Sequence, residues 1–149
     1  MGGDFSAAFT GTARLSAANT SNRFNPAHEA ALAVAFWVYP TQLTPGTYYP
    51  YATVEGGSQA TDGWFIYREG STNKFQAGYS NGTNTFSVAA VVPVVNTWYL
   101  VVGNWFNSGP SPTVELIVYN TAGSLTDSTN TGTGYVNATA SGVTIESLS

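Results

Sequence analysis

The chain has 149 residues and a mass of 15.7 kDa, which is enough for one ordinary domain and too little for two independent hydrophobic cores. With 43% hydrophobic and 14% aromatic residues it can bury a sizeable core, which excludes intrinsic disorder and collagen-like structure. Only 8% of the residues are charged, the net charge is −4, and the few basic residues are scattered, which disfavours nucleic-acid binding and attraction to anionic membranes. The lack of cysteine excludes disulfides, thiolate nucleophiles and zinc ribbons. We therefore predict a single domain over residues 1–149.

The composition also bears on location. Asn, Thr, Ser and Gly supply most of the polar groups, which is typical of rigid extracellular or particle-borne β-proteins. No apolar run approaches the roughly 20 residues that span a bilayer, so no membrane insertion is expected. Residues 1–4 lack the basic and apolar regions of a secretory signal, which fits either a virion component or a trimmed N-terminus. We predict an extracellular or virion-surface location.

The hydrophobic pattern predicts strands along nearly the whole chain. Short strands at residues 5–9 and 13–17 flank a turn at Gly11, and residues 28–32 are the only segment with helix propensity, spanning barely one turn. Residues 32–39 are apolar throughout, so we predict a strand that is buried on both faces and ends at Pro40. The Asn-Gly pair at 81 and 82 predicts a hairpin turn. Further strands are predicted at residues 49–54, 63–68, 74–79, 85–91, 98–105, 114–119 and 143–148, with weak strands or loop between 121 and 142.

Strands at this spacing predict an all-β, two-sheet antiparallel β-sandwich, because two sheets bury their apolar faces against each other. Uninterrupted apolar strands indicate the core. The residues predicted to contribute to it are Phe36, Trp37, Trp98, Leu100, Val102, Leu116 and Val118, and Trp105 is also predicted to be buried.

Several segments resemble a known family. Residues 4–16, 24–26 and 35–40 resemble the opening of LamG-like jelly rolls, which belong to the concanavalin A-like lectin/glucanase superfamily. Later family landmarks follow in the same order at residues 63–67, 78–82, 96–103 and 114–120. The resemblance covers nearly the whole chain and implies a concanavalin A-like jelly roll.

Departures from the family pattern bear on function. Relatives often carry acidic residues after the position of Gly11, where this chain has Thr12, Ala13 and Arg14, so the resemblance gives no support for calcium binding there. Glucanase relatives act through a strand with alternating carboxylates, whereas Glu115 has no acidic neighbour two positions away. His28 has no accompanying Cys or Asp motif. We therefore predict that the protein is not an enzyme.

The family ending is also shortened. Relatives continue beyond the segment that matches residues 143–145 with a last strand that pairs beside the first, whereas this chain ends at Ser149. That strand is dispensed with, lies outside this sequence, or is supplied by a neighbouring molecule. In the last case the edge formed by Phe5, Ala7 and Phe9 becomes a template for association.

Aromatic residues supply the remaining contact candidates. Tyr48, Tyr49 and Tyr51 form a cluster that can stack on a sugar, pack on a partner or serve internal packing. Trp64, at the start of a strand, is a candidate of the same kind or a core residue. Asp62 is a weak candidate for calcium, since a hard cation prefers several carboxylates and the spacing offers one. No other metal or cofactor is expected.

Two hypotheses of function follow. In the first, the domain is a non-catalytic structural or decoration subunit of an extracellular assembly such as a phage virion, and its partners are copies of itself or neighbouring structural proteins. In the second, it is a carbohydrate-binding or adhesion module of a secreted or cell-surface bacterial protein. The missing signal, the shortened C-terminus and the scarcity of polar ligand-binding clusters favour the first.

Overall fold

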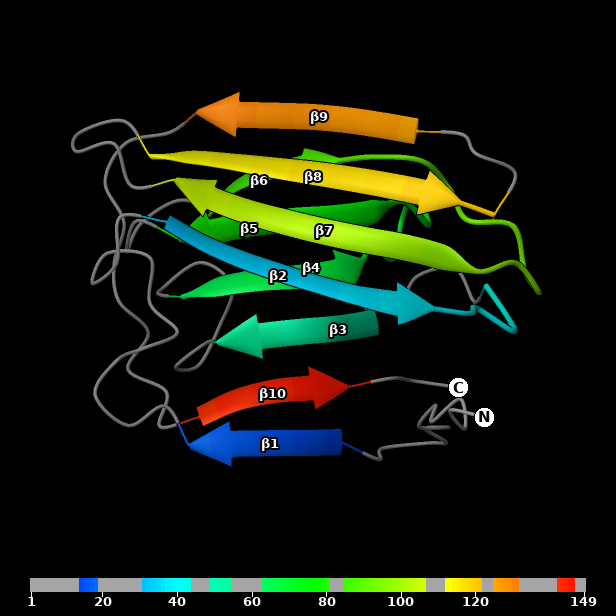
Figure 1. The fold of residues 1–149 in the computed structure, drawn as a ribbon, viewed down its shortest axis with the longest axis horizontal. Coiled ribbons are helices and arrows are strands. Elements are labelled where there is room, and N and C mark those ends of the chain that lie inside the picture. Colours follow the sequence, from blue (N-terminus) through cyan, green and yellow to red (C-terminus); the bar gives the residue numbers. More distant parts are fainter. Residues whose placement is uncertain are drawn as a thin grey trace, which may run out of the picture.

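The computed structural model describes residues 14–18, 31–43, 49–54, 63–80, 85–106, 112–121, 125–131 and 142–146. Within these ranges the regular elements are all strands (Figure 1). Their bounds are β1 Arg14–Ala18, β2 Ala31–Val38, β3 Tyr49–Val54, β4 Trp64–Arg68, β5 Phe75–Ser80, β6 Thr85–Ala89, β7 Tyr99–Phe106, β8 Thr113–Asn120, β9 Leu125–Thr131 and β10 Gly142–Glu146. Most predicted strands are confirmed to within one or two residues.

The strands form two antiparallel sheets, which confirms the predicted β-sandwich. One sheet has six strands in the order β1-β10-β3-β4-β5-β6, and the other has four in the order β2-β7-β8-β9. Figure 1 shows the four-stranded sheet lying across β4, β5 and β6. The antiparallel pair β5 and β6, which connects Ser80 with Thr85 in register, is the predicted hairpin; its turn lies outside the described residues.

The C-terminal strand lies inside the larger sheet. β10 pairs with β1 over five residues and with β3 on its other side, so the last described strand lies beside the first. The predicted edge of Phe5, Ala7 and Phe9 lies outside the described residues, and so does His28. The predicted bare edge at residues 5–9 therefore stays a prediction.

The core fills the space between the two sheets. The six-stranded sheet contributes large residues of β4 and β5, and the four-stranded sheet contributes alternate residues of β7 and β8. The buried cluster consists of Trp64, Ile66, Phe75, Ala77, Tyr79, Val88, Ala90, Tyr99, Val101, Trp105, Val114, Leu116 and Val118, with Leu32, Val34, Phe36 and Val38 packed against it. The core positions of Trp105, Leu116 and Val118 are confirmed, and Phe36 is partly buried against the cluster.

Trp105 joins the two sheets. Its indole Nε1–H donates to the carbonyl oxygen of Gly78 in β5 at 3.0 Å, and its ring lies 4.7 Å from that of Trp64. The ring also passes over Gly103, where an added Cβ would lie 2.7 Å from the Trp105 Cη2 and 2.9 Å from the Ile66 Cδ1. Gly103 is therefore required by this close approach. A second link across the core runs from the Tyr79 hydroxyl to the carbonyl oxygen of Pro112 at 2.9 Å.

The four-stranded sheet buries only one of its faces, which corrects part of the predicted core. In β2 exposed and partly buried residues alternate, so the prediction that residues 32–39 are buried on both faces is wrong. Trp37 is 58% exposed and Trp98 is 41% exposed. Leu100 and Val102 alternate with the buried Tyr99 and Val101, so they also face away from the core. The physical reason is that a strand's side chains alternate between faces, and only one face contacts the other sheet.

Candidate functional site

Of the aromatic contact candidates predicted from the sequence, the structure describes the side chain of Trp64 alone. Tyr49 and Tyr51 lie in β3, between β10 and β4 in the middle of the six-stranded sheet, and the pairing register shifts between Pro50 and Ala52. The bulge at Tyr51 explains how a proline is tolerated in an internal strand. The side chains of these two tyrosines, together with Tyr48 and Asp62, lie outside what the structure describes.

Trp64 is not a surface residue. It is 1% exposed, and its ring packs against Trp105 in the core. The alternative in which it forms a platform for a ligand is therefore wrong, and the core alternative is correct.

Exposed apolar side chains gather instead on the outer face of the four-stranded sheet. The pairing of β2, β7 and β8 aligns Trp37 with Leu100 and Tyr119 in one row across the sheet. The next row along the strands is also apolar, consisting of Ala35, Val102 and Ile117. In the part of the chain that the structure describes, no element packs over this face (Figure 1).

The segment that leads from β6, in the six-stranded sheet, to the start of β7 is also apolar and exposed. Val91, Val92, Val94 and Val95 are all exposed, Val94 at 64%, while Pro93 between them is buried. Trp98 follows in the same segment, and its ring lies 5.2 Å from that of Tyr39, just after β2. We call the exposed set the apolar end of the sandwich: Trp37, Tyr39, Val91, Val92, Val94, Val95, Trp98 and Tyr119.

Hydrogen bonds hold the valine segment in place. The backbone N–H of Val94 donates to the Tyr99 hydroxyl oxygen at 2.8 Å, and that of Asn96 donates to the carbonyl oxygen of Pro40 at 2.7 Å. Asn96 has a φ of 60°, a left-handed conformation that asparagine tolerates better than most residues. The segment is thus fixed to both β2 and β7, and its valines are presented on a rigid support.

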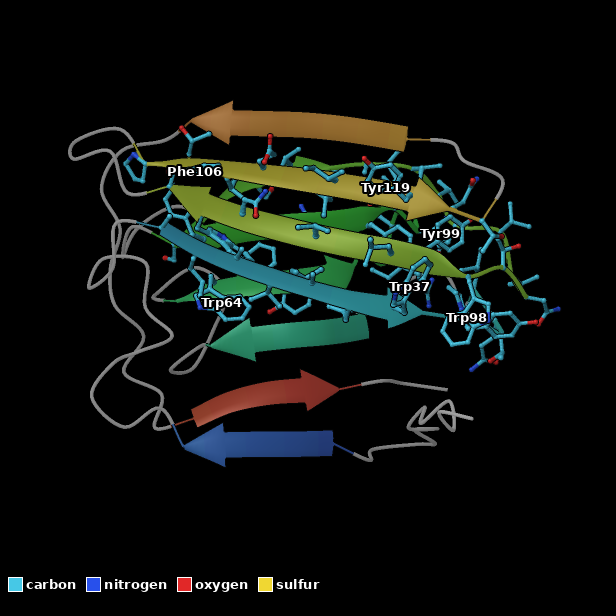
Figure 2. The ribbon with its side chains drawn as sticks, viewed as in Figure 1. Trp37, Trp64, Trp98, Tyr99, Phe106 and Tyr119 are labelled. Atoms are coloured by element: carbon cyan, nitrogen blue, oxygen red, sulfur yellow. The ribbon has the colours of Figure 1, made fainter. Side chains whose placement is uncertain are left out.

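Figure 2 shows how unevenly the exposed aromatic residues are distributed. Trp37, Trp98 and Tyr119 lie toward the end where β2 ends, β7 begins and β8 ends. Phe106, at 43% exposure, lies at the opposite end of β7. Three of the four exposed aromatic residues labelled there thus lie toward one end of the sheet.

Acidic residues are sparse on the four-stranded sheet. Asn104 Nδ2 donates to Glu115 Oε2 at 2.6 Å. Strand pairing places Asp127 opposite Ile117, diagonally across from Glu115 on the neighbouring strand. Among the residues that the structure describes, no group of three or more His, Cys, Asp or Glu is arranged to hold a metal ion.

The turn between β4 and β5 lies at the same end as the valines. The Phe75 N–H donates to the Val91 carbonyl oxygen at 3.2 Å, and the Ala90 N–H donates to the Phe75 carbonyl oxygen at 2.8 Å. Lys74, which is exposed, directly precedes Phe75, and its carbonyl oxygen accepts from the Glu69 N–H at 2.8 Å. The turn thus adjoins the valine segment through the backbone of Phe75 and carries one acidic and one basic residue.

The Glu69 carboxylate organises that turn. It accepts hydrogen bonds from the hydroxyl and backbone N–H groups of both Thr72 and Ser71, at distances from 2.6 to 2.9 Å. These donors, the Thr72 hydroxyl first, lower the pKa of Glu69 from 4.5 to about 2. Next to it, the buried Arg68 donates to the side-chain oxygen of Asn73, which has a φ of 58°.

Comparison with known proteins adds no family assignment: no family model matches the chain, and no curated protein matches it. The described residues contain no helix long and apolar enough to cross a membrane.

Sequence reasoning missed the valine segment. The sequence pattern predicts one strand over residues 85–91, whereas β6 ends at Ala89 and the valines around Pro93 continue its apolar composition into the loop. Pro93 is the signal that identifies the loop. A proline has no N–H to donate, so it interrupts the hydrogen bonding of a strand, although the valines on both sides of it continue the apolar run.

Proposed function

We propose that this protein is a non-catalytic structural or decoration subunit of an extracellular assembly, of the kind found on phage virions. The observation that carries the proposal is the apolar end, where eight large apolar side chains are exposed on a rigid support. Large apolar side chains exposed toward one end of a soluble protein mark a contact site. The low charge of the chain, with Asn, Thr, Ser and Gly supplying most of its polar groups, is typical of rigid extracellular or particle-borne β-proteins.

The side chains of the apolar end favour a protein partner over a sugar. Its centre combines aliphatic and aromatic side chains, Val94 and Trp98 among them, as the buried centres of protein interfaces do. Valine offers no flat ring for stacking on a sugar. The four valines therefore favour a protein partner.

The proposed absence of catalysis is tested on the two acidic residues of the four-stranded sheet. We expect no turnover of laminarin or a related β-glucan by the wild-type protein. A rate that is abolished by Glu115→Gln or Asp127→Asn, but not by Asp62→Asn, would contradict the non-catalytic assignment.

A carbohydrate-binding module is the second candidate function. The observation that favours it is Trp37, which is 58% exposed in the same row as Tyr119 and can present a ring to the apolar face of a sugar. Exposed Thr41, Gln42 and Asn96 lie in the adjoining segments and offer hydroxyl and amide groups.

A glycan array separates the two functions. For a structural subunit we expect no glycan bound by the wild-type protein. Binding that is lost in Trp37→Ala and retained in Phe106→Ala would overturn the structural role and establish the carbohydrate-binding module instead.

A further inference from the structure

We infer that the apolar end is the surface through which two copies of this chain meet, related by a two-fold axis. The inference rests on the proposed structural role and specifies the partner of the same surface. Three properties of the described residues support a second copy as the occupant: area, charge and rigidity.

The exposed area matches what a dimer needs. An aromatic side chain buries about 150–250 Å² when fully covered. Summed over the partly exposed aromatic residues and valines, the apolar end offers roughly 600–700 Å², close to the ~800 Å² that each partner contributes to a standard interface. The surface is therefore large enough for a specific contact, and larger than scattered surface residues provide.

The charge distribution favours approach at this end. The chain carries a net charge of −4, so two copies repel each other over most orientations. Within the described residues the apolar end itself, including residues 37–43 and 90–99, has no charged side chain. An end-to-end contact thus brings together the surfaces that repel least.

The rim of the apolar end is self-complementary. Glu69 and Lys74 carry opposite charges and lie in the turn that adjoins the valine segment through Phe75; the Glu69 N–H donates to the Lys74 carbonyl oxygen. A two-fold axis makes such a contact reciprocal. When Glu69 of one copy faces Lys74 of the other, Lys74 of the first copy also faces Glu69 of the second. An apolar centre with such a polar rim is the usual composition of a protein interface.

The support of the surface is formed before association. The bonds from Val94 to Tyr99 and from Asn96 to Pro40 fix the valine segment within the single chain. A surface that is already ordered loses little conformational entropy on binding. This favours association without a rearrangement of the loop.

The experiment measures association of the full chain by sedimentation equilibrium over a wide concentration range. We expect a monomer–dimer equilibrium whose dissociation constant rises at least tenfold in Val94→Glu. The matched control is Phe106→Glu, an exposed aromatic residue at the opposite end, which should change the constant by less than twofold. If Val94→Glu does not fold, as checked by circular dichroism, Val92→Ser takes its place.

Cross-linking gives a second measurement, which reports the position at which the two copies meet. Because the chain has no cysteine, Val94→Cys introduces a single thiol. A bismaleimide should then produce covalent dimers of Val94→Cys and far fewer of Phe106→Cys.

Three outcomes would overturn the inference. These are a monomer at all concentrations without cross-linking, a dimer that Val94→Glu leaves intact, and a monomer that binds phosphatidylcholine vesicles through Val94. None of these outcomes contradicts the structural role. That role is contradicted instead by glycan binding that depends on Trp37, or by hydrolysis that depends on Glu115 or Asp127.

Discussion

The two faces of the four-stranded sheet are both apolar and have opposite environments. On the inner face Tyr99, Val101 and Trp105 are buried against β4 and β5. On the outer face Leu100 and Val102, the residues between them, are only partly covered, and Trp37 stands more than half exposed. The same residue types thus serve the core on one side and a free surface on the other.

Apolar composition alone therefore does not define the core of this protein. Trp105 and Trp37 lie in adjacent strands, yet one joins the two sheets through Gly78 while the other faces outward. Their environments differ because the six-stranded sheet covers only the inner face, on which Trp105 lies. Inner-face residues should therefore govern stability, whereas outer-face residues should govern contacts with other molecules.

The largest effect is expected for Trp105→Ala. The change removes a buried indole, the contact with Trp64 and the donor to Gly78, and it leaves a cavity between the sheets. We expect a loss of about 3–5 kcal/mol in the free energy of unfolding, measured by chemical denaturation. A loss below about 1 kcal/mol would mean that Trp105 does not hold the sheets together.

Gly103→Ala tests the same face by adding an atom. The new Cβ would clash with the Trp105 ring and with Ile66, so the ring must shift or the strand must move. We expect a loss of about 1–3 kcal/mol in the same denaturation experiment. Val102→Thr, one position away and on the partly covered outer face, is the control for a change in β7 itself. Equal stability of Gly103→Ala and wild type would show that the close approach is absent in solution.

Trp37→Ala should have a much smaller effect on stability. Its side chain is mostly exposed, so we expect the free energy of unfolding of the monomer to change by less than about 1 kcal/mol. The melt is measured at a concentration where the protein is monomeric, because association would add to the apparent stability. A loss as large as that of Trp105→Ala would place Trp37 in the core and remove the contrast between the two faces.

The smallest effect concerns Glu69 and pH. Because the folded-state pKa is lowered from 4.5 to about 2, the ionised carboxylate stabilises the turn above pH 4.5, and this contribution is lost as the pH falls toward 2. In Glu69→Gln that part of the pH dependence should disappear. Thermal melts of both proteins between pH 2 and 6 measure it, and a carboxyl pKa near 4.5 by NMR would contradict the turn geometry.

The positions of the strands were predictable from the sequence, but their buried faces were not. Turn residues such as Gly70 and Gly82 punctuate the apolar runs, so the two-sheet sandwich follows from local signals. In residues 32–39 and 98–105, however, both alternating sets are apolar, and the pattern cannot say which set meets the other sheet. The prediction for Trp105 was correct and those for Trp37 and Trp98 were wrong for this reason.

The candidate site was less predictable than the fold. A contact surface depends on which segments meet at one end of the sandwich, here the valine segment, the end of β2 and the turn of Glu69. These segments are far apart in the sequence, whereas the tyrosine candidates near residue 50, whose side chains lie outside the described residues, are neighbours in the chain. Side-chain clusters formed by topology leave no such local signal.

The placement of the tryptophans also makes the protein its own optical reporter. Trp64 and Trp105 are shielded from water and in ring contact, whereas Trp37 and Trp98 are open to it, and the chain has no others. Acrylamide or iodide should quench the long-wavelength, solvent-exposed emission first and leave the blue-shifted emission of the shielded pair. The ring contact should also give an exciton couplet in circular dichroism that vanishes only on unfolding. Opening of the core and coverage of the surface can thus be followed separately in one unlabelled sample.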